Sequence, residues 1–488
     1  MKKVAVIGAG VGGLAVAIRL ARMGYAVSVY EQASHAGGKL NESRMGAYRF
    51  DRGPSLFTMP ELLDELLDPE LRIAYRKLEL VTRYFYEDGT RLNAYADQQR
   101  FARELKAKLG VPVQAVTRYL QKAAQLYRIT APIFIFNSLH RLSGLLSWSN
   151  LRRAMQLPQI QAFTTLHRKN QAAFNDPRLV QLFDRFATYN GSNPYQAPAT
   201  LQVIAHLEHN QGAYFPDRGM YAIAEALQQQ AEKLGVKFHF NTPVQRVAPG
   251  DRATKIVQVG GQQIAYDLVV SDVDVRYFYD SLLQDGAHRK PRRKEEPSSS
   301  ALIFYWGMDG VYDQLDLHNL FFSADYEAEF DCLFRQKTIS NDPTVYVYVS
   351  NKMTGSDAPP GAENWFVMVN APVDEGQDWE RLKLQTRARI VEKLERMLNC
   401  EIESRIVCEE LLDPQGIEQL SSSVGGAIYG TSSNSLWSAF RRHPNHRKTM
   451  PGLYFVGGSV HPGGGIPLCL SSAKIVADWI GEKEEGHD

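Results

Sequence analysis

The sequence predicts an α/β protein with a Rossmann-like domain assembled from discontinuous segments, plus a second domain with a mixed or antiparallel sheet and a helical part. Three observations support this fold class. An apolar strand, a glycine loop and a helical pattern open the chain within residues 4–24. A second strand and glycine turn come only at residues 453–467. Alternating stretches typical of antiparallel strands, such as residues 344–349, lie between them.

The N-terminal segment has the residue order of a dinucleotide-binding unit. Residues 4–7 form a short β-branched run, and residues 26–30 form a second apolar strand that ends at Glu31. The loop between strand and helix fits G-x-G-x-x-G at Gly8, Gly10 and Gly13, and Gly12, inside the motif, is a further candidate cofactor contact. Such glycines permit a tight turn, close approach to a pyrophosphate and close helix packing, and the terminal acid binds an unphosphorylated ribose. The order therefore predicts a dinucleotide site and argues against NADP.

A glycine pair and a base follow Glu31 closely, at Gly37, Gly38 and Lys39. This spacing resembles the extended signature of the FAD-dependent amine oxidase and desaturase superfamily, which NAD dehydrogenases lack. The resemblance implies FAD as the cofactor and adds these three residues to its predicted site. The alternative interpretation of the pair is a plain surface turn.

Later segments return to the same pattern. A glycine-containing block at 212–220 precedes a helical pattern, and residues 267–272 form a buried strand with an acidic end. In the superfamily the corresponding strands rejoin the N-terminal sheet, and the residue matching Val244 lies against the adenine. The strand at 453–456 leads into Gly457 and Gly458, which predicts a second ligand site at the flavin end of the cofactor. A glycine-rich hairpin without a ligand is the alternative.

Ordered motifs extend the resemblance along the whole chain. The stretch SVHPGGGIP, which contains Ile466, resembles the THPGAGIP signature of the phytoene-type carotenoid desaturases of bacteria. Further blocks fit that family in order at residues 50–55, 191–194, 212–220, 267–271 and 358–361. The first block implies cofactor contacts from Pro54 and Ser55. Residues 53–60 and 85–90 look most like the 1-hydroxycarotenoid 3,4-desaturases, whereas Arg218, Gly464 and Leu468 depart from the usual pattern.

The resemblance implies dehydrogenation, in which a hydride leaves an allylic C–H for the flavin and a proton leaves the adjacent carbon. The best expectation is C-3,4 desaturation of a 1-hydroxycarotenoid in carotenoid biosynthesis, and a multi-step desaturase of the phytoene, neurosporene or lycopene type is the alternative. Two further hypotheses are a related saturase or isomerase and a non-enzymatic isoprenoid carrier. His461 is the candidate catalytic group beside the flavin, although a structural role in the glycine turn fits the sequence equally.

A carotenoid substrate predicts contact with a membrane. Moving about forty carbons from a bilayer into water costs on the order of 30 kcal/mol. Residues 131–148 are apolar with aromatic ends and are flanked by Arg141, Arg152 and Arg153, which suits a membrane surface, although ordinary core helices fit as well. The basic run at 288–294 fits a solvated loop better than a lipid contact. We expect a cytoplasmic protein that binds the inner membrane peripherally and meets other carotenoid-biosynthesis enzymes there.

The amino-acid composition limits which partners and which kinds of site can be expected. A net charge of +1 over 488 residues argues against nucleic acid as a partner. The four cysteines have no metal-ligand spacing, so reduced thiols and no metal site are expected, and neither a signal peptide nor a membrane-spanning run is indicated. The predicted domains are an FAD domain from 1–85, 212–285 and 425–488, a helical substrate entrance at 86–211 and a substrate sheet at 286–424.

Overall fold

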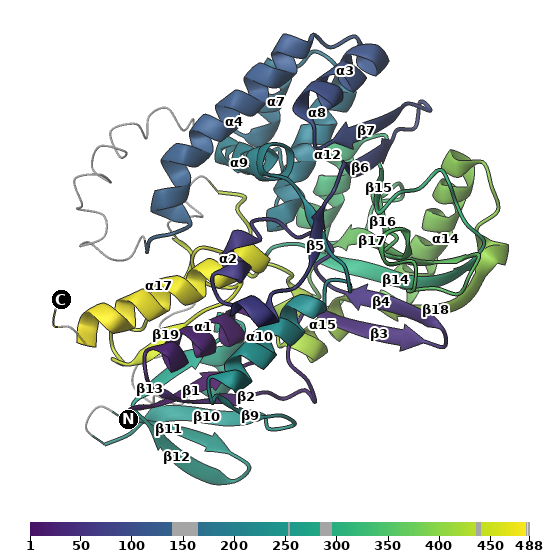
Figure 1. Ribbon diagram of the computed structural model, residues 1–488. Helices are drawn as coiled ribbons and strands as arrows, with labels where there is room; N and C mark the ends of the chain where they lie inside the picture. Colours follow the sequence, from purple (N-terminus) through teal and green to yellow (C-terminus); the bar gives the residue numbers. More distant parts are fainter. Residues whose placement is uncertain (139–163, 252–253, 284–294, 436–440, 485, 487–488) are drawn as a thin grey trace.

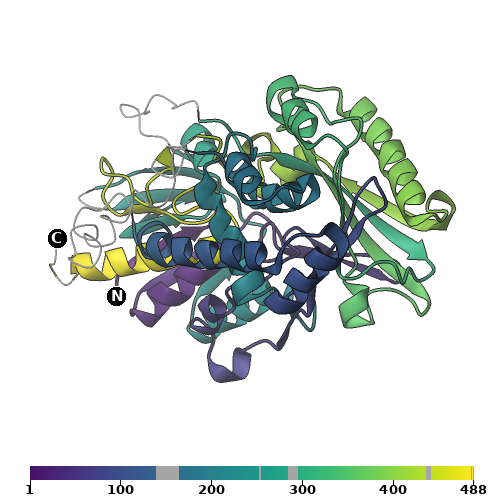
Figure 2. The same ribbon diagram turned by 90° about the horizontal axis from the view of Figure 1, so that it is seen from above.

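The computed structural model describes residues 1–138, 164–251, 254–283, 295–435, 441–484 and 486. Two lobes lie side by side, one around a parallel sheet that contains the first strand of the chain and packs against its last helix, and one around a larger mixed sheet (Figure 1). Seen from above, helix α14 (Trp379–Leu398) lies at the opposite end of the molecule from the first strand of the chain (Figure 2). The predicted fold class, a Rossmann-like lobe from discontinuous segments beside a mixed sheet, is confirmed.

The first lobe is built on a five-stranded sheet whose neighbouring strands all run parallel. Its strands, in spatial order, are β19 (Leu453–Phe455), β13 (Leu268–Ser271), β1 (Lys3–Ile7), β2 (Ala26–Tyr30) and β9 (Lys237–His239). Three distant chain segments thus supply neighbouring strands. Because parallel strands end at the same edge, the segments after β1, β2, β13 and β19 meet in space.

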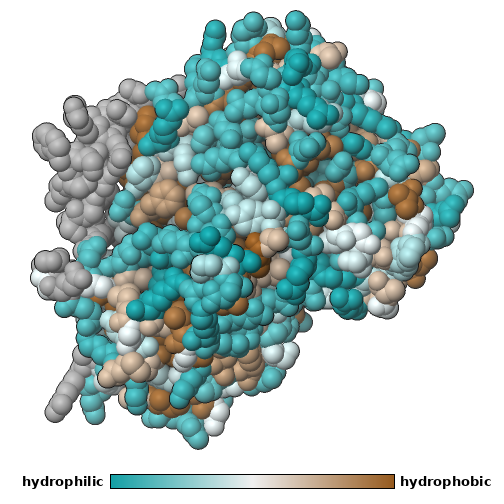
Figure 3. Space-filling model, viewed as in Figure 1, coloured by the Kyte–Doolittle hydropathy of each residue, from teal (hydrophilic) through white to brown (hydrophobic). Residues whose placement is uncertain are grey.

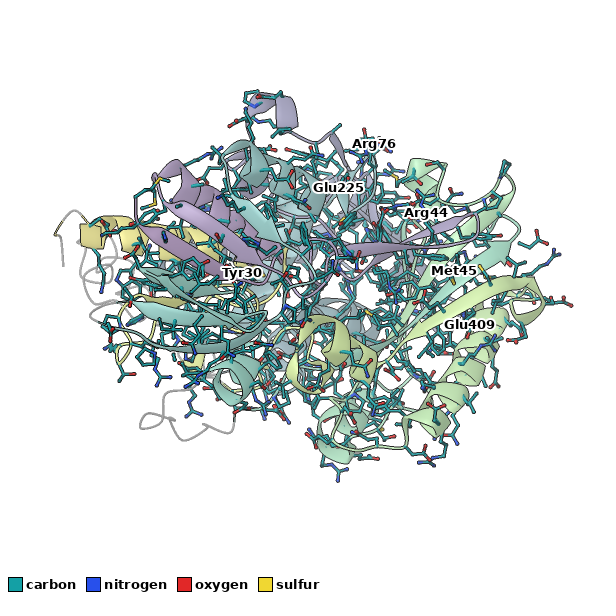
Figure 4. All side chains as sticks on the ribbon, turned by 90° about the horizontal axis from the view of Figure 1, so that it is seen from below. Tyr30, Arg44, Met45, Arg76, Glu225 and Glu409 are labelled. Atoms are coloured by element: carbon teal, nitrogen blue, oxygen red, sulfur yellow. The ribbon has the colours of Figure 1, made fainter. Side chains whose placement is uncertain are left out.

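Both faces of this sheet are covered, as its apolar strands require. Helices α1 (Val11–Arg22), α10 (Ala222–Lys233) and α17 (Ile466–Glu484) pack their apolar sides into one core with β1 and β2. On the other face lies a three-stranded antiparallel sheet of β10 (Val244–Pro249), β11 (Lys255–Val259) and β12 (Gln262–Tyr266). At this face the hydroxyl groups of Tyr30, labelled in Figure 4, and Tyr266 lie 2.6 Å apart.

The second lobe is built on a seven-stranded mixed sheet. Its strands, in spatial order, are β18 (Ile406–Leu412), β14 (Ser300–Asp309), β17 (Ala362–Ala371), β16 (Val345–Tyr348), β15 (His318–Phe321), β6 (Leu80–Phe85) and β7 (Arg91–Tyr95). Only β15 and β6 pair in parallel. Strand β6 falls within residues 1–85, the segment predicted for the FAD domain, yet it pairs in this second sheet. A short strand does not reveal from its own sequence which sheet it joins.

Helices cover this sheet and the space between the lobes. Helix α14 (Trp379–Leu398) packs an apolar side on β14 and β17. Helices of the second core are α3 (Gln98–Leu109), α4 (Val113–Phe134), α7 (Leu166–Ala173), α8 (Pro177–Asp184), α9 (Val203–His206) and α12 (Tyr326–Asp331). Shorter helices are α2 (Glu61–Asp64), α11 (Val275–Tyr277), α13 (Asn351–Thr354), α15 (Pro414–Ser421), η1 (Pro69–Leu71), η3 (Arg185–Asn190), η4 (Ala199–Gln202), η5 (Leu207–Gln211), η6 (Phe278–Leu282), η7 (Cys332–Gln336), η8 (Glu403–Arg405) and η9 (Val424–Gly426).

Two small sheets join the lobes, formed by β3 (Asn41–Met45) with β4 (Tyr48–Arg52) and by β5 (Tyr75–Lys77) with β8 (Tyr214–Pro216). Arg44 and Met45 of β3 and Glu409 of β18 all lie in the part of the molecule away from Tyr30 in Figure 4.

A buried ion network fixes this junction. The Arg49 guanidinium bonds to the carboxylates of Asp51 at 2.8 Å and Asp357 at 3.2 Å. Asp51 also accepts hydrogen bonds from the Tyr348 hydroxyl and the Met220 backbone N–H. The motif at 50–55 therefore ties β4 to β16 and to the block at 212–220.

Hydrophilic residues cover most of the face seen in Figure 3, with apolar ones scattered among them. Within the described part of the chain, no helix is both long and apolar enough to cross a bilayer. Most of the segment predicted to touch a membrane, together with Arg141, Arg152 and Arg153, lies outside the described residues, as does the basic run at 288–294.

Candidate cofactor and substrate site

Four strand ends converge at the carboxyl edge of the parallel sheet. Gly8 follows β1, Glu31 follows β2, Asp272 follows β13 and Gly457 follows β19 by two residues. The backbone N–H of Asp272 donates to the carbonyl oxygen of Ile7, and that of Val456 donates to Ser271, which locks the strand ends together. The edge of a parallel sheet beside a helix N-terminus is where such folds bind dinucleotides.

The glycines at this edge are required by close contacts. A Cβ on Gly13 would lie 2.1 Å from the carbonyl oxygen of Gly8, so only glycine lets α1 pack on β1. A Cβ on Gly12 would lie 2.9 Å from the backbone nitrogen of Gly457. The N-terminal loop and the late glycine turn, more than four hundred residues apart in the chain, are thus in direct contact.

Glu31 is buried and holds the loop in place. One carboxylate oxygen accepts the backbone N–H of Ala9 at 2.7 Å, and the other accepts that of Ala33 at 2.8 Å. Each carboxylate oxygen has two lone pairs, so capacity remains for the hydroxyl groups of a ribose.

Asp272 lies among the glycines and is the unexpected member of the site. Its carboxylate accepts backbone hydrogen bonds from Gly13 and Gly10 at the N-terminus of α1. A Cβ on Gly10 would come within 2.5 Å of one of its oxygens, and a Cβ on Gly457 within 2.2 Å of the other. Burial, with a smaller effect of the Glu31 charge, raises the pKa of Asp272 to about 7, against the lowering effect of these hydrogen bonds and of Lys39.

A single cavity of about 720 Å³ begins at this edge and continues between the lobes. Ligand pockets in proteins commonly have about 300–1,000 Å³. Thirteen of the predicted residues line it: Gly8, Gly10, Gly12, Glu31, Gly37, Gly38, Lys39, Pro54, Ser55, Val244, Gly458, His461 and Ile466. Gly13 and Gly457 are not among its lining residues and act through the packing described above.

The Lys39 side chain lines the cavity and reaches the backbone of residues 427–428. Its ammonium donates to the carbonyl oxygens of Ala427 at 3.1 Å and Ile428 at 2.8 Å, and burial lowers its pKa. The sequence predicted a cofactor contact from this residue. Its observed bonds fix the segment that carries Tyr429, another lining residue, against which a Cβ on Gly464 would clash at 2.7 Å.

His461 is buried, and its ring is held by backbone. Its Nε2 lies 2.8 Å from the carbonyl oxygen of Asn137, and because a carbonyl only accepts, Nε2 is the donor. The Asn445 side-chain amide donates to the carbonyl oxygen of His461, and the His461 N–H donates to that of His443. These hydrogen bonds fix the backbone at His461, which precedes the cavity-lining residues Gly464 and Gly465.

The remaining walls combine apolar and polar side chains. Apolar lining residues from the helices and from the mixed sheet are Phe134, Ile135, Ile204, Leu207, Ile303, Leu320, Phe366 and Met368. Polar lining residues that no sequence pattern predicted as site residues include Arg185, Glu208, Asp272, His318 and Tyr346. The only sequence signal among them was the acidic end of the strand before Asp272, because the other four come from segments that meet only in the folded chain.

The chain matches the family of flavin containing amine oxidoreductases over residues 11–480. It belongs to that family. The flavoprotein is 45% identical over 485 residues, 98% of this chain and 99% of the relative, to a 1-hydroxycarotenoid 3,4-desaturase of Flavobacterium sp. (strain P99-3). It is 31% identical, over 99% of both chains, to a 4,4'-diaponeurosporene oxygenase of Staphylococcus aureus (strain MRSA252). The resemblance to carotenoid desaturases is thereby confirmed.

Solved structures support the fold of the flavoprotein. A putrescine oxidase variant shares it with a TM-score of 0.65 at 14% identity, over 99% of both chains. A fatty acid isomerase from P. acnes shares it with a TM-score of 0.63 at 13% identity, over 98% of both chains.

The donor set of the site fits a flavin dinucleotide. A Cβ on Gly10 or Gly12 would lie 2.5 Å from an Asp272 carboxylate oxygen, so only backbone fits at the N-terminus of α1, and Glu31 presents carboxylate oxygens at the end of the next strand. The same cavity is lined by Lys39 and by Gly458 at the late glycine turn, so the two predicted ends of the cofactor site open into one space. The cofactor of this oxidoreductase is FAD, as predicted.

Proposed function

We propose that the protein is an FAD-dependent carotenoid desaturase that introduces the C-3,4 double bond into a 1-hydroxylated acyclic carotenoid. The observation that carries this proposal is the 45% identity, over 98% of the chain, to a protein with that activity. The continuous cavity with apolar walls supports it, since a polyene chain needs an apolar channel that leads to the cofactor.

When bound, FAD accepts a hydride from a substrate C–H bond. The protein positions the cofactor and the substrate and keeps water out of the site. The N-terminus of α1 and Glu31 would hold the pyrophosphate and ribose, while Pro54, Ser55 and the turn at Gly458 border the space expected for the ring. The apolar side chains of α4 and of the mixed sheet exclude water and align the polyene.

His461 remains a proposed polar group beside the flavin. Its Nε2 donates to Asn137, so its ring plane is fixed, and its backbone anchors the glycine turn. A His461→Gln variant that keeps bound flavin but loses turnover would support a role in the reaction. Loss of flavin together with activity would support the purely structural role.

We further propose that the enzyme binds the cytoplasmic face of a membrane and takes its substrate from there. The cost of exposing a carotenoid to water, on the order of 30 kcal/mol, supports direct transfer. Phe134 and Ile135 line the cavity and belong to the stretch 131–148 whose composition predicts membrane contact. Flotation of the holoenzyme with liposomes tests this, and protein that stays at the bottom of the gradient with and without anionic lipid would contradict it.

The test of activity uses the holoenzyme on liposomes that carry phytoene, lycopene or a 1-hydroxylated acyclic carotenoid in separate samples. A red-shifted absorbance and a mass loss of two hydrogens with the hydroxylated substrate alone would support the proposal. Conversion of phytoene would favour the multi-step desaturase. A gain of oxygen in the product would instead favour an oxygenase like the Staphylococcus relative, and a gain of hydrogen a saturase.

A further inference from the structure

A buried polar cluster lies on the wall of the otherwise apolar part of the cavity. The Arg185 guanidinium bonds to Glu208 at 2.9 Å, and the Tyr189 hydroxyl donates to the same carboxylate and accepts from Arg185 at 3.1 Å. Arg185 is 6% exposed and Glu208 1%. Taking an ion pair out of water is costly, so a cavity for hydrocarbon alone would not be expected to have one on its wall.

His318 of β15 lines the same cavity as this pair, interacts electrostatically with both of its members and is 3% exposed. Its Nδ1 is 2.8 Å from the Tyr346 hydroxyl, which lies 2.7 Å from the hydroxyl of Ser55. The other ring nitrogen, Nε2, is buried and has no hydrogen-bond partner among the described residues. Burial lowers the pKa of His318 to about 3, against the raising effect of the Glu208 charge and with a smaller lowering effect of Arg185, so the ring is neutral and has one donor and one acceptor nitrogen.

We propose that Nε2 of His318, beside the Arg185–Glu208 pair, forms the subsite for the hydroxyl group of the carotenoid end. This inference rests on the proposed function and names the residue that would recognise its substrate. A hydroxyl both donates and accepts, so it satisfies Nε2 whichever nitrogen of the ring carries the proton. The remaining hydrogen-bonding capacity of the hydroxyl would face the adjacent charged pair.

The position of the subsite suits the bond to be oxidised. Carbon C-1 of the substrate bears the hydroxyl and is only two bonds from C-3. The group that recognises the hydroxyl must therefore lie close to the flavin ring. His318 is connected through Tyr346 to Ser55, one of the residues predicted to contact the cofactor.

Selectivity follows from the unpaired nitrogen. A hydrocarbon end group would keep Nε2 buried without a partner, whereas the hydroxylated end would pair it. Sites built to bond a substrate hydroxyl reject the analogue that lacks it, because the polar groups of the site then stay unpaired. We expect the wild-type enzyme to prefer the hydroxylated carotenoid by about 10- to 100-fold in kcat/KM.

The test compares wild type with His318→Leu on two liposomal substrates, a 1-hydroxylated acyclic carotenoid and the same carotenoid without the hydroxyl. We expect H318L to lose about 10- to 100-fold in kcat/KM for the first substrate, mainly through KM, and to change little for the second. Flavin absorbance of the purified holoenzyme checks that the cofactor site is intact. His318→Gln retains a polar side chain and should recover part of the preference.

His209 provides a matched control. It is also a buried neutral histidine, with its pKa lowered to about 4 by burial, and both of its ring nitrogens have no hydrogen-bond partner among the described residues. It stacks on Phe101, and its Nε2 lies 3.8 Å from Oε1 of Glu208, but it is not a lining residue of the cavity and so does not reach the substrate. His209→Phe should therefore leave the ratio between the two substrates unchanged.

The outcomes separate the two hypotheses. If H318L and H318Q keep the wild-type ratio, or lose both activities equally, the subsite is wrong and the desaturase proposal stands. If wild type converts both carotenoids equally well, the subsite is wrong as well. If wild type converts neither, the proposed function fails. Should H318L not fold, H318Q and the substrate-induced change in the flavin spectrum still measure binding of the two carotenoids.

Discussion

Replacing Asp272 with asparagine should make the apoprotein more stable at alkaline pH. The carboxylate lies at the N-terminus of α1, where it accepts backbone hydrogen bonds from Gly13 and Gly10. Asparagine has nearly the same shape and keeps one acceptor oxygen, but it cannot ionise. The substitution therefore tests the free-energy cost of the buried charge itself.

The pKa gives the sign and the size of this effect. The pKa of Asp272 is raised from an ordinary value of 3.8 to about 7, so the folded state binds its proton more tightly than the unfolded state does. Folding stability then falls as pH rises from about 4 to about 7, and the loss is complete above pH 7. Three pH units correspond to about 4 kcal/mol. Because Asp272 borders the cavity, water there reduces the cost, and we expect about 2–4 kcal/mol.

The assay is urea unfolding of the apoprotein at pH 5 and pH 8, followed by circular dichroism. Asp272→Asn should exceed the wild type by about 2–4 kcal/mol at pH 8 and by clearly less at pH 5. Asp267→Asn, at the other end of the same strand region, serves as the control for a general charge effect. Its Oδ2 accepts the Lys3 backbone N–H near the protein surface.

The raised pKa of Asp272 also affects binding of the cofactor. A pyrophosphate at the N-terminus of α1 would place more negative charge beside Asp272, so the carboxyl should take up a proton when FAD binds. Wild-type affinity for FAD should therefore weaken above pH 7, and that of D272N should change much less. Equal stability of D272N and wild type at both pH values would refute the argument, as would a wild-type FAD affinity that does not vary between pH 6 and pH 9.

Three further predictions concern the same framework. Gly13→Val should prevent FAD binding, because a Cβ there would lie 2.1 Å from the Gly8 carbonyl oxygen; the purified protein should be colourless, and a yellow protein would contradict this. Glu31→Ala should weaken FAD binding by about tenfold or more, since the loop loses two hydrogen bonds; equilibrium dialysis measures it, and an unchanged affinity would argue against the ribose contact. Arg49→Met should cost about 3–5 kcal/mol in urea unfolding, because it leaves Asp51 buried without its cation; a loss below 1 kcal/mol would show that the network relaxes.

Local order along the chain was sufficient to predict the cofactor end of the site. The strand, glycine loop, helix and terminal acid are neighbours in sequence, so the close approach of Gly13 to Gly8 and the hydrogen bond from Ala9 to Glu31 follow from one supersecondary unit. The late turn at Gly457 was predictable for the same reason, because its strand and its glycines are also neighbours in sequence. Motif order then led to the family and to FAD.

Only the tertiary structure showed which residues form the substrate end of the cavity. Arg185, Glu208 and His318 come from a helix after α8, a helical turn after α9 and an inner strand of the mixed sheet, and none of these segments marks its residues as partners. Asp272 was visible as an acid at a strand end, but its place between two glycine segments depends on the order of β1, β13 and β19 in the sheet. The physical reason is that the groups around a side chain determine whether its nitrogen has a hydrogen-bond partner and how far its pKa is shifted. In this protein those surroundings are assembled from segments hundreds of residues apart.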